Sequence, residues 1–293
     1  VTQRIHRRHP HRRRRRQHRV NVYISSDMEG VAGVCAWQQV DARTPHPEYA
    51  IYRRYYTDEV SNAIEGARAA GATGVLVNDS HGPMRNLLLD ELPSDVRVLF
   101  GNRKPFSMVQ DADAGFGGAF FVGYHGGAGD ADAVLAHTYT PSVIYEVRLN
   151  GVRCSEATIN AGLLGHWGVP LLLVTGDRTT VEGVQAQMPW VLGVIVKDSI
   201  GSFAANSMMP GAACRAIRRA AEEAIRNAAQ AMPLRFDPPL TLDVALVTAA
   251  QAHLVATIPG FERTGSRSVR FTHEAFPVVF KAFVATWRLG AQA

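Results

Sequence analysis

The chain has 293 residues, of which 46% are hydrophobic, as expected for a soluble globular protein of one large or two modest domains. No apolar run approaches the roughly 20 residues that a membrane-spanning helix needs, so no such helix is expected. The net charge of +5 comes from one end: residues 1–19 hold nine arginines, and removing these nine from the 31 basic residues leaves 22 against 26 acidic ones.

The basic segment at residues 1–19 includes five consecutive arginines, Arg12 to Arg16. Blocks of like charge are usually disordered and can bind nucleic acid or anionic surfaces. We expect a disordered tail, which could also lie upstream of the natural start. The rest of the chain has no second basic cluster with interleaved aromatic residues, so nucleic acid is expected as a partner only through this tail.

The location is expected to be cytoplasmic. A secretory signal would carry an apolar stretch of 7–15 residues after the basic segment, and only a half-polar run of seven follows here. The three cysteines Cys35, Cys154 and Cys214 are far apart, which fits a reducing compartment. Cys154, two residues before an acid, could be a nucleophile or metal ligand, but a small buried hydrophobic residue is the simpler interpretation.

From residue 20 to about 200, the hydrophobic pattern alternates between the periods of strands and helices. This alternation predicts an α/β fold, with a mainly parallel sheet covered by helices on both faces. The expected elements are strand 20–26, helix 48–70, strands 75–77, 96–100 and 119–124, a hairpin over 143–155 that turns at Asn150-Gly151, helix 156–166, strand 171–174, a helix after Asp177, and strand 191–196.

The character of the chain changes after about residue 202. An Ala-rich amphipathic helix is expected over 208–232, followed by a strand at 242–248, a helix at 249–258 and a strand at 266–272. A last helix is then expected, with the aromatic residues Phe276, Phe280, Phe283 and Trp287 along one face. We interpret this part as a second, smaller C-terminal α/β domain, so that the domains are residues 20–200 and 201–293.

Acids and histidines follow the expected strands at the points where these end. Asp27 and Glu29 follow the first strand, His81 follows the second, and His125 follows the strand at 119–124. Ligands of open α/β sheets sit beyond the carboxyl ends of the strands. Carboxylates and imidazoles are usual ligands of a catalytic divalent metal such as zinc. Asp79 or Ser80 could orient the imidazole of His81.

Two further candidates lie nearby in the sequence. Glu156 begins a helix, where an acid is also favoured by the helix dipole. His137 lies twelve residues after His125. Asp27, Glu29, His81, His125 and Glu156 give five candidate ligands, and five fit two metals better than one if a carboxylate bridges them. His137 is then left for proton transfer or direct attack.

The chain resembles the DppA-type D-aminopeptidases, a family of dinuclear zinc metallopeptidases. The matching segments, in the family's order, are Ser26-Asp-Met-Glu-Gly-Val31, Val77-Asn-Asp-Ser-His81, Lys104-Pro-Phe-Ser-Met108, Gly123-Tyr-His125, Leu135-Ala-His-Thr138, Glu156 with Asn160-Ala161, and Gly176-Asp177. Together they span roughly residues 20–290.

The resemblance implies that the five candidate ligands bind two zinc ions, with Asp27 shared, and that His137 is the catalytic base or nucleophile. It adds Asp79, Lys104, Asn160 and Asp177 as residues that support the site or contact substrate. It also implies a homo-oligomeric ring, a decamer, whose inner cavity restricts substrates to short peptides.

The chain departs from the family pattern at two places. Gly126-Gly127-Ala128 stands where members often have Ala-Arg-Ala, which puts substrate specificity in doubt, and Arg178 stands where a second acid can follow Asp177. Neither departure removes an expected ligand.

Three functions are compatible with these residues. The first is a metallo-aminopeptidase acting on short peptides, such as those with N-terminal D-residues. The second is another dinuclear hydrolase, a phosphoesterase or amidohydrolase, which would use the same ligand types. The third is a non-catalytic peptide-binding protein, which leaves the five candidate ligands unexplained.

Overall fold

The computed structural model describes residues 20–43 and 46–293, so the predicted basic tail lies outside the described residues. Within them, the larger sheet has seven strands in the order β3-β2-β1-β4-β7-β8-β9. Every neighbouring pair is parallel except β8 and β9, which confirms the predicted, mainly parallel sheet. Its strands are β1 (Val20–Ser26), β2 (Ala72–Asp79), β3 (Arg97–Leu99), β4 (Gly118–Tyr124), β7 (Leu171–Asp177), β8 (Leu192–Ser199) and β9 (Ala205–Ser207).

The register of this sheet brings the ends of its central strands together. Ser26, the last residue of β1, pairs with Asp79 at the end of β2 and with Val122 near the end of β4. The residues that follow these three strands therefore emerge at the same edge of the sheet, as the sequence predicts.

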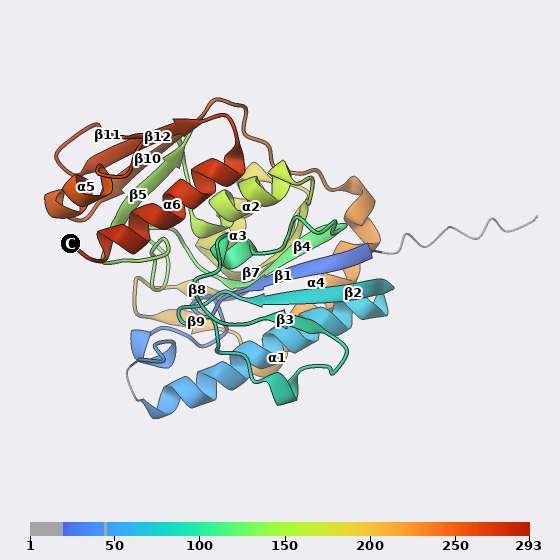
Figure 1. Cartoon of the computed structure of the whole chain (residues 1–293). Coiled ribbons are helices and arrows are strands. Elements are labelled where there is room, and N and C mark those ends of the chain that lie inside the picture. Colours follow the sequence, from blue (N-terminus) through green and yellow to red (C-terminus); the bar gives the residue numbers. More distant parts are fainter. Residues whose placement is uncertain (1–19, 44–45) are drawn as a thin grey trace, which may run out of the picture.

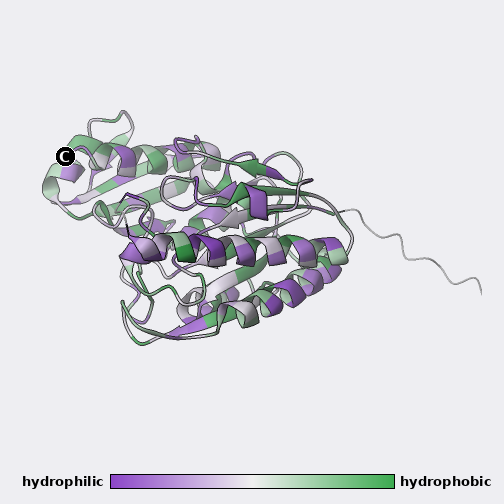
Figure 2. Cartoon of the chain, turned by 90° about the horizontal axis from the view of Figure 1, so that it is seen from below, coloured by the Kyte–Doolittle hydropathy of each residue, from purple (hydrophilic) through white to green (hydrophobic). Residues whose placement is uncertain are grey.

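Helices cover both faces of the large sheet (Figure 1). On one face, α1 (Pro47–Ala69) and α4 (Pro210–Asn227) pack on the alternate β1 residues Val22 and Ile24. On the other, α2 (Glu156–His166) and α3 (Arg178–Gln187) share a core with Tyr23. Figure 2 shows the molecule from below, and hydrophilic and hydrophobic residues are mixed along the helices on this side. This is expected for helices that bury one side.

The second sheet is antiparallel and has the order β11-β12-β10-β5-β6 in the described residues. Along β10 every second residue is buried, so one face of the sheet packs inward. Buried aromatic residues of α6 cover that face. The elements of this region are β5 (Ile144–Leu149), β6 (Val152–Arg153), β10 (Leu240–Leu246), α5 (Ala249–Val255), β11 (Phe261–Arg263), β12 (Ser268–His273) and α6 (Phe276–Gly290).

The two sheets do not divide the chain at residue 200. The hairpin β5–β6 pairs with β10 in the second sheet, although it precedes residue 200. Conversely, α4 follows residue 200 but packs closely on α1, where a Cβ on Gly66 would lie 2.2 Å from Arg218 O. Pairing between distant segments cannot be read from local periodicity, so the division into domains 20–200 and 201–293 stays a prediction.

The predicted elements agree with the structure to within a few residues at most ends. The hairpin turn at Asn150-Gly151 has positive φ at both residues, as a two-residue turn of this type requires. The helix expected over 208–232 begins later, at Pro210, and ends at Asn227, before a short 3-10 turn. The 3-10 helices are η1 (Trp37–Gln39), η2 (Leu89–Glu91), η3 (Ser107–Val109) and η4 (Ala228–Gln230). Among the described residues, no helix has the length and apolarity to cross a bilayer.

Candidate metal centre

Six acidic and histidine side chains meet at the carboxyl edge of the large sheet, and all of them are buried. They come from the ends of β1, β2 and β4, from the loop after β4 and from the first residue of α2. The six are Asp27, Glu29, His81, His125, His137 and Glu156. The structure thus brings together all five predicted ligands and the predicted catalytic histidine.

Asp27 lies between two histidines. Its Oδ1 is 3.1 Å from Nδ1 of His81, and its Oδ2 is 3.3 Å from Nε2 of His125. The backbone N–H of Met28 donates to Oδ1 and helps to fix the carboxylate. Each carboxylate oxygen therefore faces a different imidazole, which is the arrangement needed for one carboxylate to bridge two cations.

Each of the three imidazoles has one nitrogen next to a backbone carbonyl. His81 Nε2 donates to Val40 O at 2.7 Å, His125 Nδ1 to Gly126 O at 2.9 Å, and His137 Nδ1 to Leu135 O at 2.8 Å. A carbonyl oxygen only accepts, so these nitrogens carry the protons. The other nitrogen of each ring points toward the carboxylates, as in metal-bound histidines.

His125 gives the clearest sign that a cation belongs here. Its Nε2 is buried without a hydrogen bond and lies 3.3 Å from Asp27 Oδ2 and 3.5 Å from Glu156 Oε1. Burial alone would lower the pKa of His125, but the charges of Glu156 and Asp27 raise it well above its usual value. A lone pair facing two carboxylates is unfavourable, so this nitrogen needs either a proton or a metal ion.

The donor atoms form two overlapping groups with the spacing of metal ligands. One contains Asp27, Glu29 and His125, and the other contains His125, His137 and Glu156. His81 adjoins the first group, because its Nδ1 is 2.9 Å from Glu29 Oε2. Oxygen and imidazole donors in sets of three match a catalytic zinc site. The residues therefore fit two metal ions.

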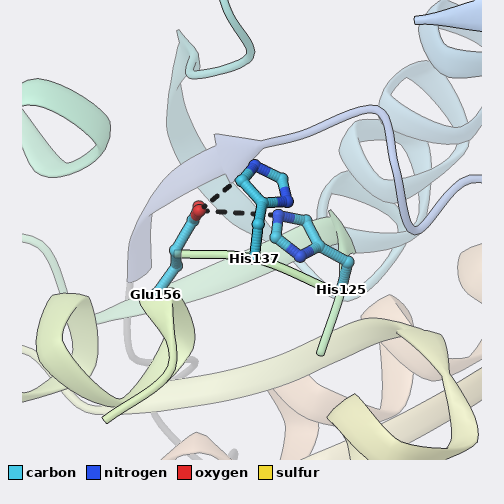
Figure 3. Close-up of side chains that lie close together, drawn as sticks. All are labelled: His125, His137 and Glu156. Atoms are coloured by element: carbon cyan, nitrogen blue, oxygen red, sulfur yellow. Dashed lines mark ion pairs between the residues drawn. The ribbon is translucent and has the colours of Figure 1, made fainter. Parts of the chain in front are cut away.

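His137 lies beside His125 and Glu156 (Figure 3). Its Nε2 is 3.8 Å from Glu156 Oε1 and 4.0 Å from Glu29 Oε1. The backbone on either side of it, at Leu135 and Tyr139, has positive φ, an uncommon conformation for such residues that clusters at functional sites. The loop thus holds the imidazole where it could transfer a proton or bind a metal.

The chain that follows Asp27 turns sharply under the site. A Cβ on Gly30 would lie 1.9 Å from Tyr124 O, so only glycine fits there. Glu59 of α1 accepts a hydrogen bond from Ala32 N at 2.9 Å, and burial raises the pKa of Glu59 to about 7. These contacts hold the loop that carries Glu29.

Lys197 is a buried residue of the site that the sequence analysis missed. It lies near the end of β8 and donates to three carbonyl oxygens of the loop after Asp27. Burial lowers its pKa to about 8, against the opposing effects of Asp177, Glu59 and Glu29. The available signal was a lysine directly after the apolar run of a strand that ends at the same edge of the sheet.

Asp79 does not orient the imidazole of His81, and neither does Ser80. The carboxylate of Asp79 accepts hydrogen bonds from Asn86 and Leu87, and Val40 O takes the histidine N–H instead. Lys104 bonds to Asn78 Oδ1 and, at 2.7 Å, to Asp79 O, and burial lowers its pKa to about 8. These residues support the β2 end of the site.

Asn160 and Asp177 occupy structural positions beside the centre. Asn160 lies between two tyrosines: its Nδ2 is 3.2 Å from Tyr124 OH, and its Oδ1 accepts from Tyr139 OH at 2.7 Å. Tyr139 N donates in turn to Glu156 Oε1 at 2.6 Å, so Asn160 is linked to a candidate ligand. Asp177 caps α3 by accepting from Thr180 N.

The two glycines that depart from the family pattern line a cavity of about 180 Å³ beside His125. A Cβ on Gly126 would lie 2.3 Å from Ala133 Cβ, and one on Gly127 would lie 3.0 Å from Ser155 Cβ. The loop therefore packs closely because it lacks side chains here. Cys154, which also borders the cavity, is buried, and burial raises its pKa to about 12, so it is an inert thiol.

Comparison with known proteins shows the family to which the chain belongs. A family model described as D-aminopeptidase matches residues 20–285. The D-aminopeptidase of Bacillus subtilis (strain 168) is 31% identical over 274 residues, which cover 92% of this chain and 97% of that protein.

A solved structure is similar over nearly the same length. The Zn-dependent D-aminopeptidase DppA from Bacillus subtilis, described as a self-compartmentalizing protease, superposes with a TM-score of 0.89 and 30% sequence identity. The match covers 93% of this chain and 98% of that one. These similarities confirm the resemblance indicated by the motifs and the fold class predicted from the hydrophobic pattern.

Proposed function

The chain belongs to the D-aminopeptidase family, and we propose that it is a dinuclear zinc aminopeptidase that hydrolyses short peptides with N-terminal D-amino acids, such as D-Ala-D-Ala. The observation that carries this proposal is the set of three buried imidazoles, each tied to a carbonyl by one nitrogen and turned toward carboxylates with the other. The Zn-dependence of the structural relative supports the choice of metal.

We assign the metal ligands as Asp27, Glu29, His81, His125 and Glu156, with Asp27 shared between the two ions. The two carboxylate oxygens of Asp27 support this sharing, because Oδ1 lies near His81 and Oδ2 lies near His125. When bound, zinc supplies Lewis-acid polarisation of the scissile carbonyl and a lower pKa for an attacking water.

His137 is the proposed catalytic base. Its Nε2 lies beside the carboxylates, while its Nδ1 proton is held by Leu135 O. Nε2 is therefore free to take a proton from the attacking water and to deliver it to the leaving amine, a role that suits imidazole near neutral pH. Trp37 packs edge-on against the ring at 5.4 Å and limits its movement.

We further propose that the protein works as a homo-oligomeric ring. The support is the description of the DppA relative as self-compartmentalizing, and a decamer is the ring size we expect. An inner cavity would admit only short peptides.

The three cysteines are free, which supports the cytoplasm as the location. If the protein binds nucleic acid at all, we expect it to do so only through residues 1–19, which lie outside the described residues.

A panel of substrates tests the proposed reaction. Purified protein loaded with zinc should release D-Ala from D-Ala-D-Ala faster than it releases L-Ala from L-Ala-L-Ala, and should leave a phosphomonoester such as p-nitrophenyl phosphate unchanged. Turnover of the phosphoester without peptide cleavage would favour the alternative of a dinuclear phosphoesterase, which uses the same ligand types.

A further inference from the structure

Lys197 is buried at the carboxyl edge of the large sheet and has no catalytic role in the account above. Its relative exposure is 2%, although lysine is among the residues least often buried. No carboxylate oxygen of the described residues lies within 4.0 Å of its ammonium, so it does not form a direct ion pair. Its burial therefore has to be explained by other contacts.

These contacts are three backbone carbonyls of one short loop. Nζ of Lys197 donates to Glu29 O at 2.5 Å, to Val31 O at 3.0 Å and to Val34 O at 2.8 Å. An ammonium has three N–H donors, so every donor is used. Hydrogen bonds from a charged donor are stronger than those between neutral groups, so this one side chain folds the loop around itself.

The loop concerned carries Glu29. The carboxylate of Glu29 faces His81 at 2.9 Å and His137 at 4.0 Å. Before Glu29, the chain is fixed to the sheet by Asp27 N, which donates to Val122 O, and after it by Gly30 N, which donates to Gly123 O. From Val31 to Val34, the loop backbone is held by hydrogen bonds to three side chains. Lys197 donates to the carbonyls of Val31 and Val34, Glu59 accepts from Ala32 N, and Ser207 accepts from Gly33 N.

We propose that Lys197 is a positioning residue for the metal centre: by binding the carbonyls of residues 29, 31 and 34, it holds the Glu29 carboxylate toward His81 and so stabilises the metal ion on that side. The inference rests on the proposed function, since it assumes a dinuclear centre. The other side, with Glu156 and His137, has no contact with Lys197 and should be much less affected.

The test compares Lys197→Met with a control that destabilises the fold elsewhere. Methionine keeps the length and fills the space but donates no hydrogen bond. Val244→Ala, in the buried core of the second sheet, should lower the melting temperature without touching the loop. Zinc bound per folded subunit is measured at a buffered free zinc concentration that just saturates the wild type, and zinc release is followed with a chromophoric chelator.

We expect the zinc content of Lys197→Met to fall from two ions per subunit to about one. The affinity of the weakened site should drop by roughly 10- to 100-fold, which is the usual effect of removing an outer partner of a metal ligand. Val244→Ala should keep two. If Lys197→Met does not fold, Lys197→Gln, which retains one shorter donor, decides the question with a smaller loss in the same direction.

Two zinc ions held by the folded Lys197 variant within about two-fold of wild-type affinity would overturn the proposal, whatever the change in melting temperature. Equal loss from Lys197→Met and Val244→Ala would also overturn it, because the effect would then follow stability alone. Failure of the wild type to bind two zinc ions would instead contradict the proposed function, so the two failures are distinguishable.

Discussion

The imidazole rings of His125 and His137 lie face to face, with centroids 4.1 Å apart and planes inclined by 5°. Two imidazolium cations would repel each other at this distance in a buried site. Both rings turn a nitrogen toward Glu156 Oε1, at 3.5 Å from His125 and 3.8 Å from His137. A cation held by His125 and Glu156 would satisfy these two groups and leave His137 beside them as the base.

Replacing His137 separates the two roles that its position allows. If it is the catalytic base, His137→Ala should lower kcat by roughly 10²- to 10⁴-fold, the usual contribution of general acid–base catalysis, and keep two zinc ions per subunit. The exposed His253→Ala on α5 should leave both quantities unchanged. Activity within a few-fold of wild type, or loss of a zinc ion, would contradict the assignment.

Replacing Glu156, unlike replacing His137, should lower the zinc content as well as the activity. Glu156→Gln keeps the shape and an oxygen for the hydrogen bond from Tyr139 N, but removes the charge beside His125 and His137. We expect loss of about one zinc ion and at least ~100-fold lower activity, since even outer partners of ligands contribute 10- to 100-fold. Zinc analysis with Glu182→Gln, an exposed acid on α3, is the matched control. Unchanged zinc content would remove Glu156 from the ligand set.

Gly30 tests whether the sharp turn after β1 is needed for the site. A Cβ there would clash with Tyr124 O, at 1.9 Å, so Gly30→Ala must displace backbone next to Asp27 and Glu29. We expect weaker zinc binding and a lower melting temperature. Gly183→Ala in α3 meets no atom within 4 Å and should be neutral or stabilising by up to about 1 kcal/mol. Similar behaviour of the two variants would show that the turn tolerates a side chain.

The buried carboxyl of Glu59 predicts a pH dependence of stability. Burial raises its pKa from 4.5 to about 7, so the folded protein holds this proton more tightly than the unfolded chain. The resulting stabilisation is present below pH 4.5 and is lost as the pH rises to 7. Glu59→Gln cannot ionise, so relative to wild type it should gain on the order of 2–3 kcal/mol between pH 5 and pH 8.

Urea unfolding at the two pH values, with a chelator present in both, measures this difference. The chelator removes the separate effect of pH on metal binding. A Glu59→Gln variant whose stability relative to wild type does not change with pH would show that Glu59 is ionised in the folded protein near its ordinary pKa.

Much of the site could be predicted from the sequence, because most of its candidate ligands come directly after the ends of strands. The apolar runs before Asp27, His81 and His125 identify parallel strands, and parallel strands end at one edge of the sheet. Glu156 was identified because it begins the helix expected over 156–166, and in the structure Ser155 caps this helix by accepting from Thr158 N.

The residues that support the ligands could not be found in this way. Val40 O holds His81 from a segment 41 residues away, and Lys197 reaches the loop after Asp27 from more than 160 residues away. The pairing of β5 with β10, in which Leu149 lies opposite Leu242, likewise joins segments that are far apart in sequence. Such contacts depend on tertiary packing, which cannot be inferred from local periodicity.

The central claim is a catalytic centre of two zinc ions, and the most direct measurement is zinc content per subunit combined with release of D-Ala from D-Ala-D-Ala. We predict close to two zinc ions, activity that is lost with a chelator, and recovery of both when zinc is restored. Protein that folds without metal, cannot be loaded with zinc and cleaves no peptide would contradict the account.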